Sequence, residues 1–163
     1  MFGFGRWLGL SGAIALAGCG GHTAAQGGPS SDFTQLKLQA WEGFGPGCSV
    51  TPEVITLVND TRALSWTICN FTGSSTPPTT GARTITQAEL DAISADLAQV
   101  KPSNAVSCGA DAGIVALDVT NAVGAQGYVD DFYSGCPSDV HKGRTFVTGL
   151  NELWNTTASI AQR

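Results

Sequence analysis

The cysteines have the clearest capacity for chemistry in this chain, and Cys19 has the most informative neighbours. A thiolate is a nucleophile and a metal ligand, and a thiol can also be oxidised. Cys19 follows Leu16-Ala17-Gly18, and Arg6 precedes an apolar run from Trp7 to Ala17 broken only by glycines and Ser11. The run is shorter than the roughly 20 residues that span a bilayer. Its charged start and small final residues are typical of a secretory signal peptide.

Leucine, two small residues and cysteine, in this order at residues 16–19, resemble the lipobox of a bacterial lipoprotein precursor. The resemblance implies that the Cys19 thiol is joined to a diacylglyceryl group and that residues 1–18 are removed. Two or three acyl chains, at about 0.8 kcal/mol per buried methylene, would then anchor the protein in the cell envelope. Gly20 is not an aspartate-type retention signal, which favours the outer membrane of a Gram-negative bacterium. The alternative is an ordinary cleaved signal in which Cys19 is incidental.

Four further cysteines remain after Cys19: Cys48, Cys69, Cys108 and Cys136. An even number in an oxidising compartment predicts two disulfides, although four cysteines allow three pairings. We favour Cys48 with Cys69 and Cys108 with Cys136, because each pair brackets a strand–turn–strand pattern. Each bridge would contribute about 3 kcal/mol in the chain-entropy model. A zinc site is the rival, but the Cys-x-x-Cys spacing of such sites is missing, so we expect no metal.

Catalytic arrangements are hard to assemble from the other residues. A nucleophile needs a neighbouring histidine, and the only two are His22, in a glycine-rich stretch, and His141. Asp130 and Asp131 are the only adjacent acids, and strand alternation would send their side chains to opposite faces. A cation site that added Asp118 or Asp139, together with His141, stays open as an alternative to solvated acids. We expect neither an enzyme nor a cofactor.

Charge limits the partners that the chain can bind. The 163 residues include 8 Lys and Arg and 13 Asp and Glu, which gives a formal net charge of −5. All the acids follow Cys19, whereas Arg6 would leave with the signal peptide. Binding to phosphate backbones needs clustered Lys and Arg, so we expect no nucleic-acid partner.

Residues 20–31 contain no charge and are rich in glycine and serine. This composition is typical of a flexible coil, with an expected span of roughly 20 Å. We therefore divide the chain into a signal peptide at 1–18, a lipidated cysteine and tether at 19–31, and a single domain at 32–163. A domain of this size can bury roughly two-thirds of its unfolded surface.

Three segments in the first half of the domain have the period-two pattern of strands. Phe33 to Trp41 alternates, with Leu36, Leu38 and Ala40 on one side. Turn formers at 59–62 separate the next two segments and predict an antiparallel hairpin in which Val58 pairs with Ala63. The hairpin strands are Glu53 to Val58 and Ala63 to Cys69. Asn70 to Arg83 is polar, with Pro77-Pro78 at its middle, and we expect a long loop there.

A second hairpin is predicted from Ile114 to Asn121, with its return strand from Gly127 to Ser134. The first strand turns Val115, Leu117 and Val119 inward. The register of the return strand is ambiguous, because its two faces are similarly apolar. One choice buries Tyr128, Asp130 and Phe132, and the other buries Val129, Asp131 and Tyr133.

Two helices are predicted. Thr86 and Glu89 form a capping box, and Ile85 and Leu90 a hydrophobic staple, at the start of the first helix, which ends at Lys101-Pro102. The apolar stripe of this helix is Leu90, Ile93, Leu97 and Val100. The last helix is expected from roughly Phe146 to Ala161 with Thr148 as its cap. Its stripe is Leu150, Leu153, Trp154 and Ile160.

These elements predict an α+β fold of order β-ββ-α-ββ-α: a five-stranded, mostly antiparallel sheet with both helices on one face. The domain also loosely resembles small exported bacterial proteins of uncharacterised function. The matching residues are Gly43 to Cys48, Ile85 to Leu90 and Gly135-Cys136. This resemblance implies no activity.

The uncovered face of the predicted sheet is the candidate binding surface, because exposed apolar patches often receive partners. Its residues would come from the second hairpin: Tyr128, Asp130, Asp131, Phe132 and Tyr133. We therefore expect a lipid-anchored binding or structural module whose partner is an envelope protein or ligand. The alternative is an inhibitor of extracytoplasmic proteases that acts through loop 70–83, and an enzyme of unrecognised class is a third hypothesis.

Overall fold

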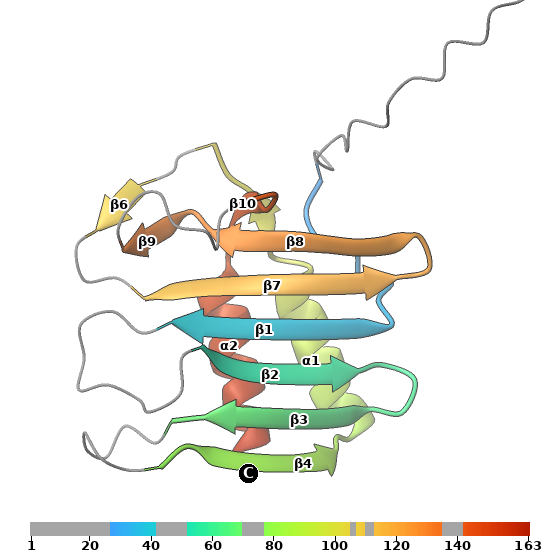
Figure 1. The fold of residues 1–163 in the computed structure, drawn as a ribbon. Helices are drawn as coiled ribbons and strands as arrows, with labels where there is room; N and C mark the ends of the chain where they lie inside the picture. The colour runs from blue at the N-terminus through green and yellow to red at the C-terminus, as the bar shows by residue number, and fades with distance from the viewer. Residues whose placement is uncertain (1–26, 42–51, 70–76, 105–106, 110–112, 135–141) are drawn as a thin grey trace, which may run out of the picture.

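The computed structural model describes residues 27–41, 52–69, 77–104, 107–109, 113–134 and 142–163 (Figure 1). In these residues the chain forms an eight-stranded mixed sheet, a separate two-stranded sheet and two helices. The helices are α1 (Gln87–Leu97) and α2 (Leu150–Ala161). The strands are β1 (Gln35–Trp41), β2 (Glu53–Val58), β3 (Ala63–Ile68), β4 (Thr79–Thr84), β5 (Lys101–Pro102), β6 (Ser107–Gly109), β7 (Ile114–Asn121), β8 (Gly124–Asp130), β9 (Phe132–Ser134) and β10 (Thr145–Thr148).

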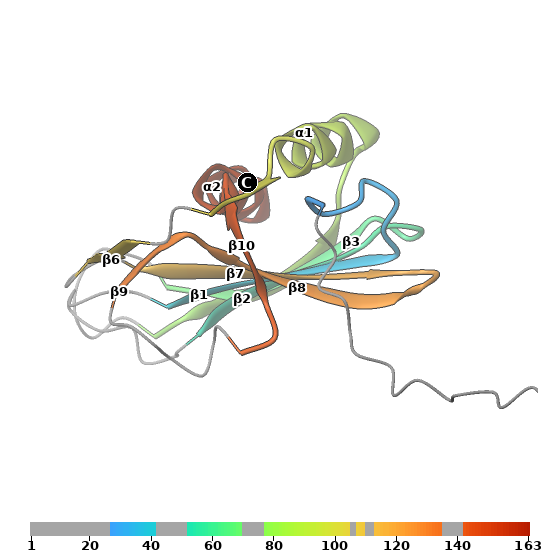
Figure 2. The same ribbon diagram turned by 90° about the horizontal axis from the view of Figure 1, so that it is seen from above.

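Across the large sheet the strands run in the order β4-β3-β2-β1-β7-β8-β10-β5. All neighbouring pairs in it are antiparallel except β8 and β10, which are parallel. Both helices cover the same face of this sheet (Figure 2). The prediction of five strands is therefore wrong, because β4, β10 and β5 extend the sheet at its two edges.

The main core lies between the large sheet and the two helices. Alternate residues of the strands and the apolar stripes of the helices form it. The predicted inward positions of β1 and β7 are buried, including Leu36, Leu38 and Leu117 at 0–1% exposure, except Ala40, which is partly buried. The first hairpin has the predicted register, with Val58 opposite Ala63. The helices contribute further buried apolar side chains to this core, which include Leu90, Ile93, Leu97, Leu150, Leu153 and Ile160.

The first helix begins as its capping pattern predicts. The Glu89 N–H donates to Thr86 Oγ1 at 3.3 Å, and the Thr86 N–H donates to Glu89 Oε2 at 2.8 Å. These two bonds satisfy amides that the first turn of a helix otherwise leaves without partners. Ile85 and Leu90, the predicted staple, are both buried in the main core. The start of α1 is therefore determined by residues of its own first turn and the residue before it.

The start of the last helix was predicted wrongly. Thr145–Thr148 forms β10, which runs parallel to β8, and α2 begins only at Leu150. The cap residue is Gly149 at φ 90°, a left-handed conformation that glycine adopts without steric cost, so Thr148 is not the cap. Val147 is fully buried in β10. Long-range pairing with β8 thus decides the structure of this β-branched segment.

The predicted loop from 70 to 83 is wrong in its second half, because Thr79–Thr84 pairs with β3 along its whole length. Residues 70–76 lie outside the described part of the chain. Gly81 lies opposite Trp66 and directly beneath its ring: a Cβ added at Gly81 would be 2.3 Å from Trp66 Cζ2. The lack of a side chain at Gly81 therefore lets the indole lie flat on the edge strand.

The prediction of two disulfides is also contradicted, because no two cysteines in the described part of the chain lie at disulfide distance. Cys69 is itself disulfide-bonded. Cys48 and Cys136 lie outside them, and Cys108 is placed in β6 without a described side chain.

Gly81→Ala should lower the free energy of unfolding by about 1–3 kcal/mol, because the new methyl group overlaps the Trp66 ring. The loss should be smaller when Gly81→Ala is made in a Trp66→Leu background, where the ring is missing. Urea unfolding followed by circular dichroism would measure both effects. An equal loss in the two backgrounds would contradict the contact.

Candidate functional site

Tyr128, the first residue of the predicted binding face, points into the molecule. It is 1% exposed and lies opposite Leu117 on the helix-covered side of the sheet. Its hydroxyl donates to Gln126 Oε1 at 2.7 Å, and burial raises the pKa of the phenol. The ring of Tyr128 is therefore part of the core.

Asp130 and Asp131 make separate contacts that join elements of the domain. Asp130 is 4% exposed and accepts a bond from Asn151 Nδ2 of α2 at 2.7 Å. Asp131 accepts a bond from Ser103 Oγ at 2.6 Å, and its N–H donates to the Val147 carbonyl at 2.9 Å. The two acids do not share a site.

The remaining residues named as candidates do not gather around these acids in the described structure. Asp118 forms an ion pair with Arg144 at 2.8 Å, and His141 lies outside the described residues. Phe132 and Tyr133 belong to β9, which pairs with β6 in the small parallel sheet, and their side chains are not described. Cys19 also precedes the first described residue.

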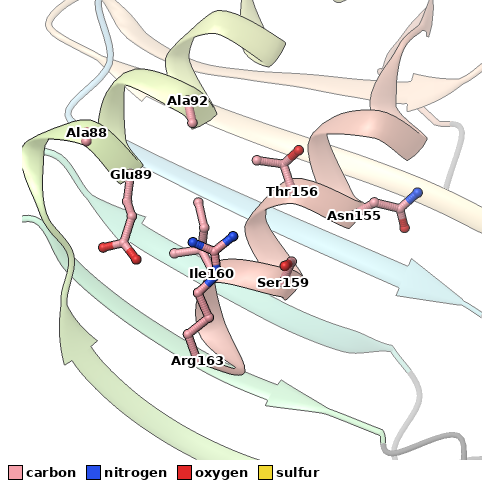
Figure 3. A pocket seen from close by; sticks show the side chains of 8 residues that line it. All are labelled: Ala88, Glu89, Ala92, Asn155, Thr156, Ser159, Ile160 and Arg163. Carbon is pink, nitrogen blue, oxygen red and sulfur yellow. The ribbon is translucent and has the colours of Figure 1, made fainter.

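A groove of about 450 Å³ lies between the two helices on the side away from the sheet (Figure 3). Its walls are mostly small or polar side chains: Ala88, Glu89, Ala92, Asn155, Thr156, Ser159, Ile160 and Arg163. Figure 3 shows Glu89 reaching from α1 toward the end of α2, where Ile160 and Arg163 lie.

A second pocket, of about 430 Å³, lies where the end of α2 meets the β3–β4 edge of the sheet. We call it the edge pocket. It is lined by Trp66, Thr79, Arg83, Ala161, Gln162 and Arg163. Strand alternation brings the β4 residues to it: Arg83 lies opposite Leu64, and Gly81 opposite Trp66, on the face that the helices cover.

Arg83 joins three elements at the wall between the groove and the edge pocket. Its Nη2 donates to Glu89 Oε1 of α1 at 2.6 Å and to the Ile160 carbonyl of α2 at 2.7 Å. The hydrogen bond from Arg83 and the bond from the Thr86 amide lower the pKa of Glu89 from 4.5 to about 2. Glu89 therefore stays ionised and already has a cationic partner.

Two N–H groups of residues that line the edge pocket are buried and have no hydrogen-bond partner among the described residues. They are Trp66 Nε1 and Arg83 Nε. Buried donors without acceptors are rare in proteins, and each costs about 1–3 kcal/mol. The lining of the edge pocket thus contains two cationic side chains, Arg83 and Arg163, whereas the two unpaired N–H groups have almost no exposed surface. The two cations suit an anionic or carboxylate ligand.

Sequence reasoning did not find the edge pocket. Trp66 lay within the predicted hairpin strand Ala63 to Cys69, Arg83 ended the predicted loop, and Arg163 had no assigned role. The three residues are brought together only by the pairing of β4 with β3 and by the position of α2. No motif in the sequence connects them.

A scan against protein-family models finds no match to this chain, and a comparison with curated proteins also finds none. In the described part of the chain, no group of three or more His, Cys, Asp or Glu side chains could hold a metal ion. Neither described helix is long and apolar enough to cross a membrane.

The lowered pKa of Glu89 predicts a pH dependence of stability. A carboxylate with a lower pKa in the folded state stabilises the fold above its unfolded pKa, near 4.5, and this contribution is lost as the pH falls toward about 2. Between these pH values the free energy of unfolding should fall less in Glu89→Gln, which keeps a capping-box residue, than in the unmodified protein. Identical curves for Glu89→Gln and the unmodified protein would contradict the assignment.

Proposed function

We propose that this chain is an exported lipoprotein of the cell envelope, anchored through Cys19, and that its domain binds a partner without catalysing a reaction. Residues 16–19 support the anchor through their resemblance to a lipobox. The edge pocket supports the binding role, because it is an open recess with two arginine side chains in its lining. The edge pocket is the single observation that carries the proposed binding role.

The position of the tether favours the same function. Gly28, near the end of the tether, packs against the Val100 carbonyl and Pro102, beside the β5 edge. The β4 edge is the opposite edge of the sheet, seven strand spacings or roughly 30 Å away. A domain held through residues 19–31 would therefore present β4 and the edge pocket away from the membrane. Gly20 favours the outer membrane, as in the sequence analysis.

The inhibitor hypothesis relied on an exposed loop from 70 to 83. The formation of β4 leaves only the residues before Thr79 for such a loop. We therefore retain the binding module as the function that the described residues support best.

Lipid anchoring predicts that Cys19→Ser, made in the full chain, moves the protein from the membrane fraction of a Gram-negative host to a soluble fraction. Incorporation of labelled palmitate should be lost at the same time. Gly20→Ser, which keeps the thiol, is the matched control and should leave both properties unchanged. A Cys19→Ser protein that remains membrane-bound, with no lipid on the unmodified protein, would contradict the proposal.

The binding role predicts covalent adducts in living cells when a photo-crosslinking residue is placed on the surface of the domain that contacts the partner. Position 82 in β4 and position 123 in the β7–β8 turn are exposed, and position 156 on α2 is half-buried; together they sample three separate surfaces of the domain. A reproducible adduct at one or more of them supports a binding module. The lack of any adduct at all three would count against it.

A further inference from the structure

The β4 edge of the sheet lacks the features that usually protect an edge strand. Unprotected edges pair readily with other strands, and proteins guard them with short strands, prolines or charges. The opposite edge is guarded in this way, because β5 has two residues, Lys101 and Pro102. In contrast, β4 has six residues and no proline, and four of the six are exposed. The exposed part of β4 after Thr79 is therefore placed to accept a further strand.

Arg83 is the one charged residue in β4, and it does not guard the edge. Its guanidinium is held by Glu89 and by the Ile160 carbonyl, on the helix-covered side of the sheet. The residues on the other side of β4 are small: Thr80, Ala82 and Thr84. An incoming strand would therefore meet neither a free charge nor a bulky side chain along β4.

The edge pocket lies on the helix-covered side of the same strand, where Thr79 and Arg83 line it. In recognition by strand addition, backbone hydrogen bonds provide affinity, and pockets for alternate side chains provide specificity. Every second side chain of a strand added to β4 would point to this side. The edge pocket is thus placed to receive one of them.

The charge of the edge pocket selects the chemistry of that side chain. Arg83 and Arg163 line it, although the whole chain has a net charge of −5. The lining contains no acid, and Glu89, which neutralises Arg83, lines the neighbouring groove. A carboxylate in the edge pocket would meet the exposed guanidinium of Arg163 beside that of Arg83. Charge-assisted hydrogen bonds of this kind are the strong ones.

We propose that β4 binds an extended acidic segment of a partner protein as an added strand, with one Asp or Glu side chain in the edge pocket. The proposal rests on the binding role proposed above and names the class of partner. A second copy of this chain fits less well. Its own β4, Thr-Thr-Gly-Ala-Arg-Thr, offers a cation and no acid to the edge pocket.

The probe is a pair of capped peptides tested on the full-length protein, purified in detergent from whichever cell fraction contains it. The acidic peptide is Ser-Thr-Glu-Val-Glu-Thr-Ser, which places both glutamates on one face of a strand. The control peptide has glutamine at both glutamate positions. Fluorescence anisotropy measures affinity, and hydrogen exchange locates the amides that become protected.

We expect the acidic peptide to bind at least tenfold more tightly than the glutamine peptide and to protect amides of β4. Arg163→Glu should weaken binding of the acidic peptide by about tenfold, which corresponds to about 1.4 kcal/mol of binding free energy. Lys101→Glu changes the net charge equally at the opposite edge and should alter affinity by less than about twofold. Both side chains are exposed, so neither substitution disturbs the core.

Equal affinity for the two peptides, or equal effects of Arg163→Glu and Lys101→Glu, would overturn the proposal. Protection outside β4 would also overturn it, and so would a dimer that forms through β4 and excludes the peptide. These results are separate from the tests of the proposed function. An adduct at position 123 or 156 without peptide binding at β4 would leave a binding module with a different site.

Discussion

The Arg83 side chain is the contact on which the functional end of this domain depends. It extends from an edge strand to the first turn of one helix and the last turn of the other, through Glu89 and the Ile160 carbonyl. The bond to Ile160 connects residues that are 77 positions apart in the sequence. Without these two bonds, β4 would lose its side-chain hydrogen bonds from Arg83 to both helices and would depend more on its ladder with β3. The edge pocket would also lose the wall that separates it from the groove between the helices.

In the proposed function, the two edges of the large sheet have different roles: the β5 edge faces the membrane attachment, and the β4 edge faces the partner. Gly28 packs beside β5, which is short, contains a proline and is closed to further pairing. At the other edge, β4 is longer, exposed and next to a cation-lined recess. In a protein with a net negative charge, a local positive recess attracts acidic partners more specifically than a uniformly charged surface would.

Sequence patterns predicted the elements whose signals are local. The capping box of Thr86 and Glu89 defines the start of α1, and the alternation of Leu36 and Leu38 defines β1, because burial of one face imposes period two. The strands β4, β5 and β10 were missed because they are polar or short and form only through pairing with distant strands. The edge pocket was missed for the same reason, since its walls come from both β3–β4 and the end of α2.

The account is tested most directly by a double-mutant cycle on Arg83 and Glu89, measured as free energies of unfolding at neutral pH. Arg83→Gln and Glu89→Gln each remove the same ion pair, so the double variant should lose less stability than the sum of the two single losses. Additive losses would mean that the two side chains do not interact. The proposed connection between the edge strand and the helices would then be wrong.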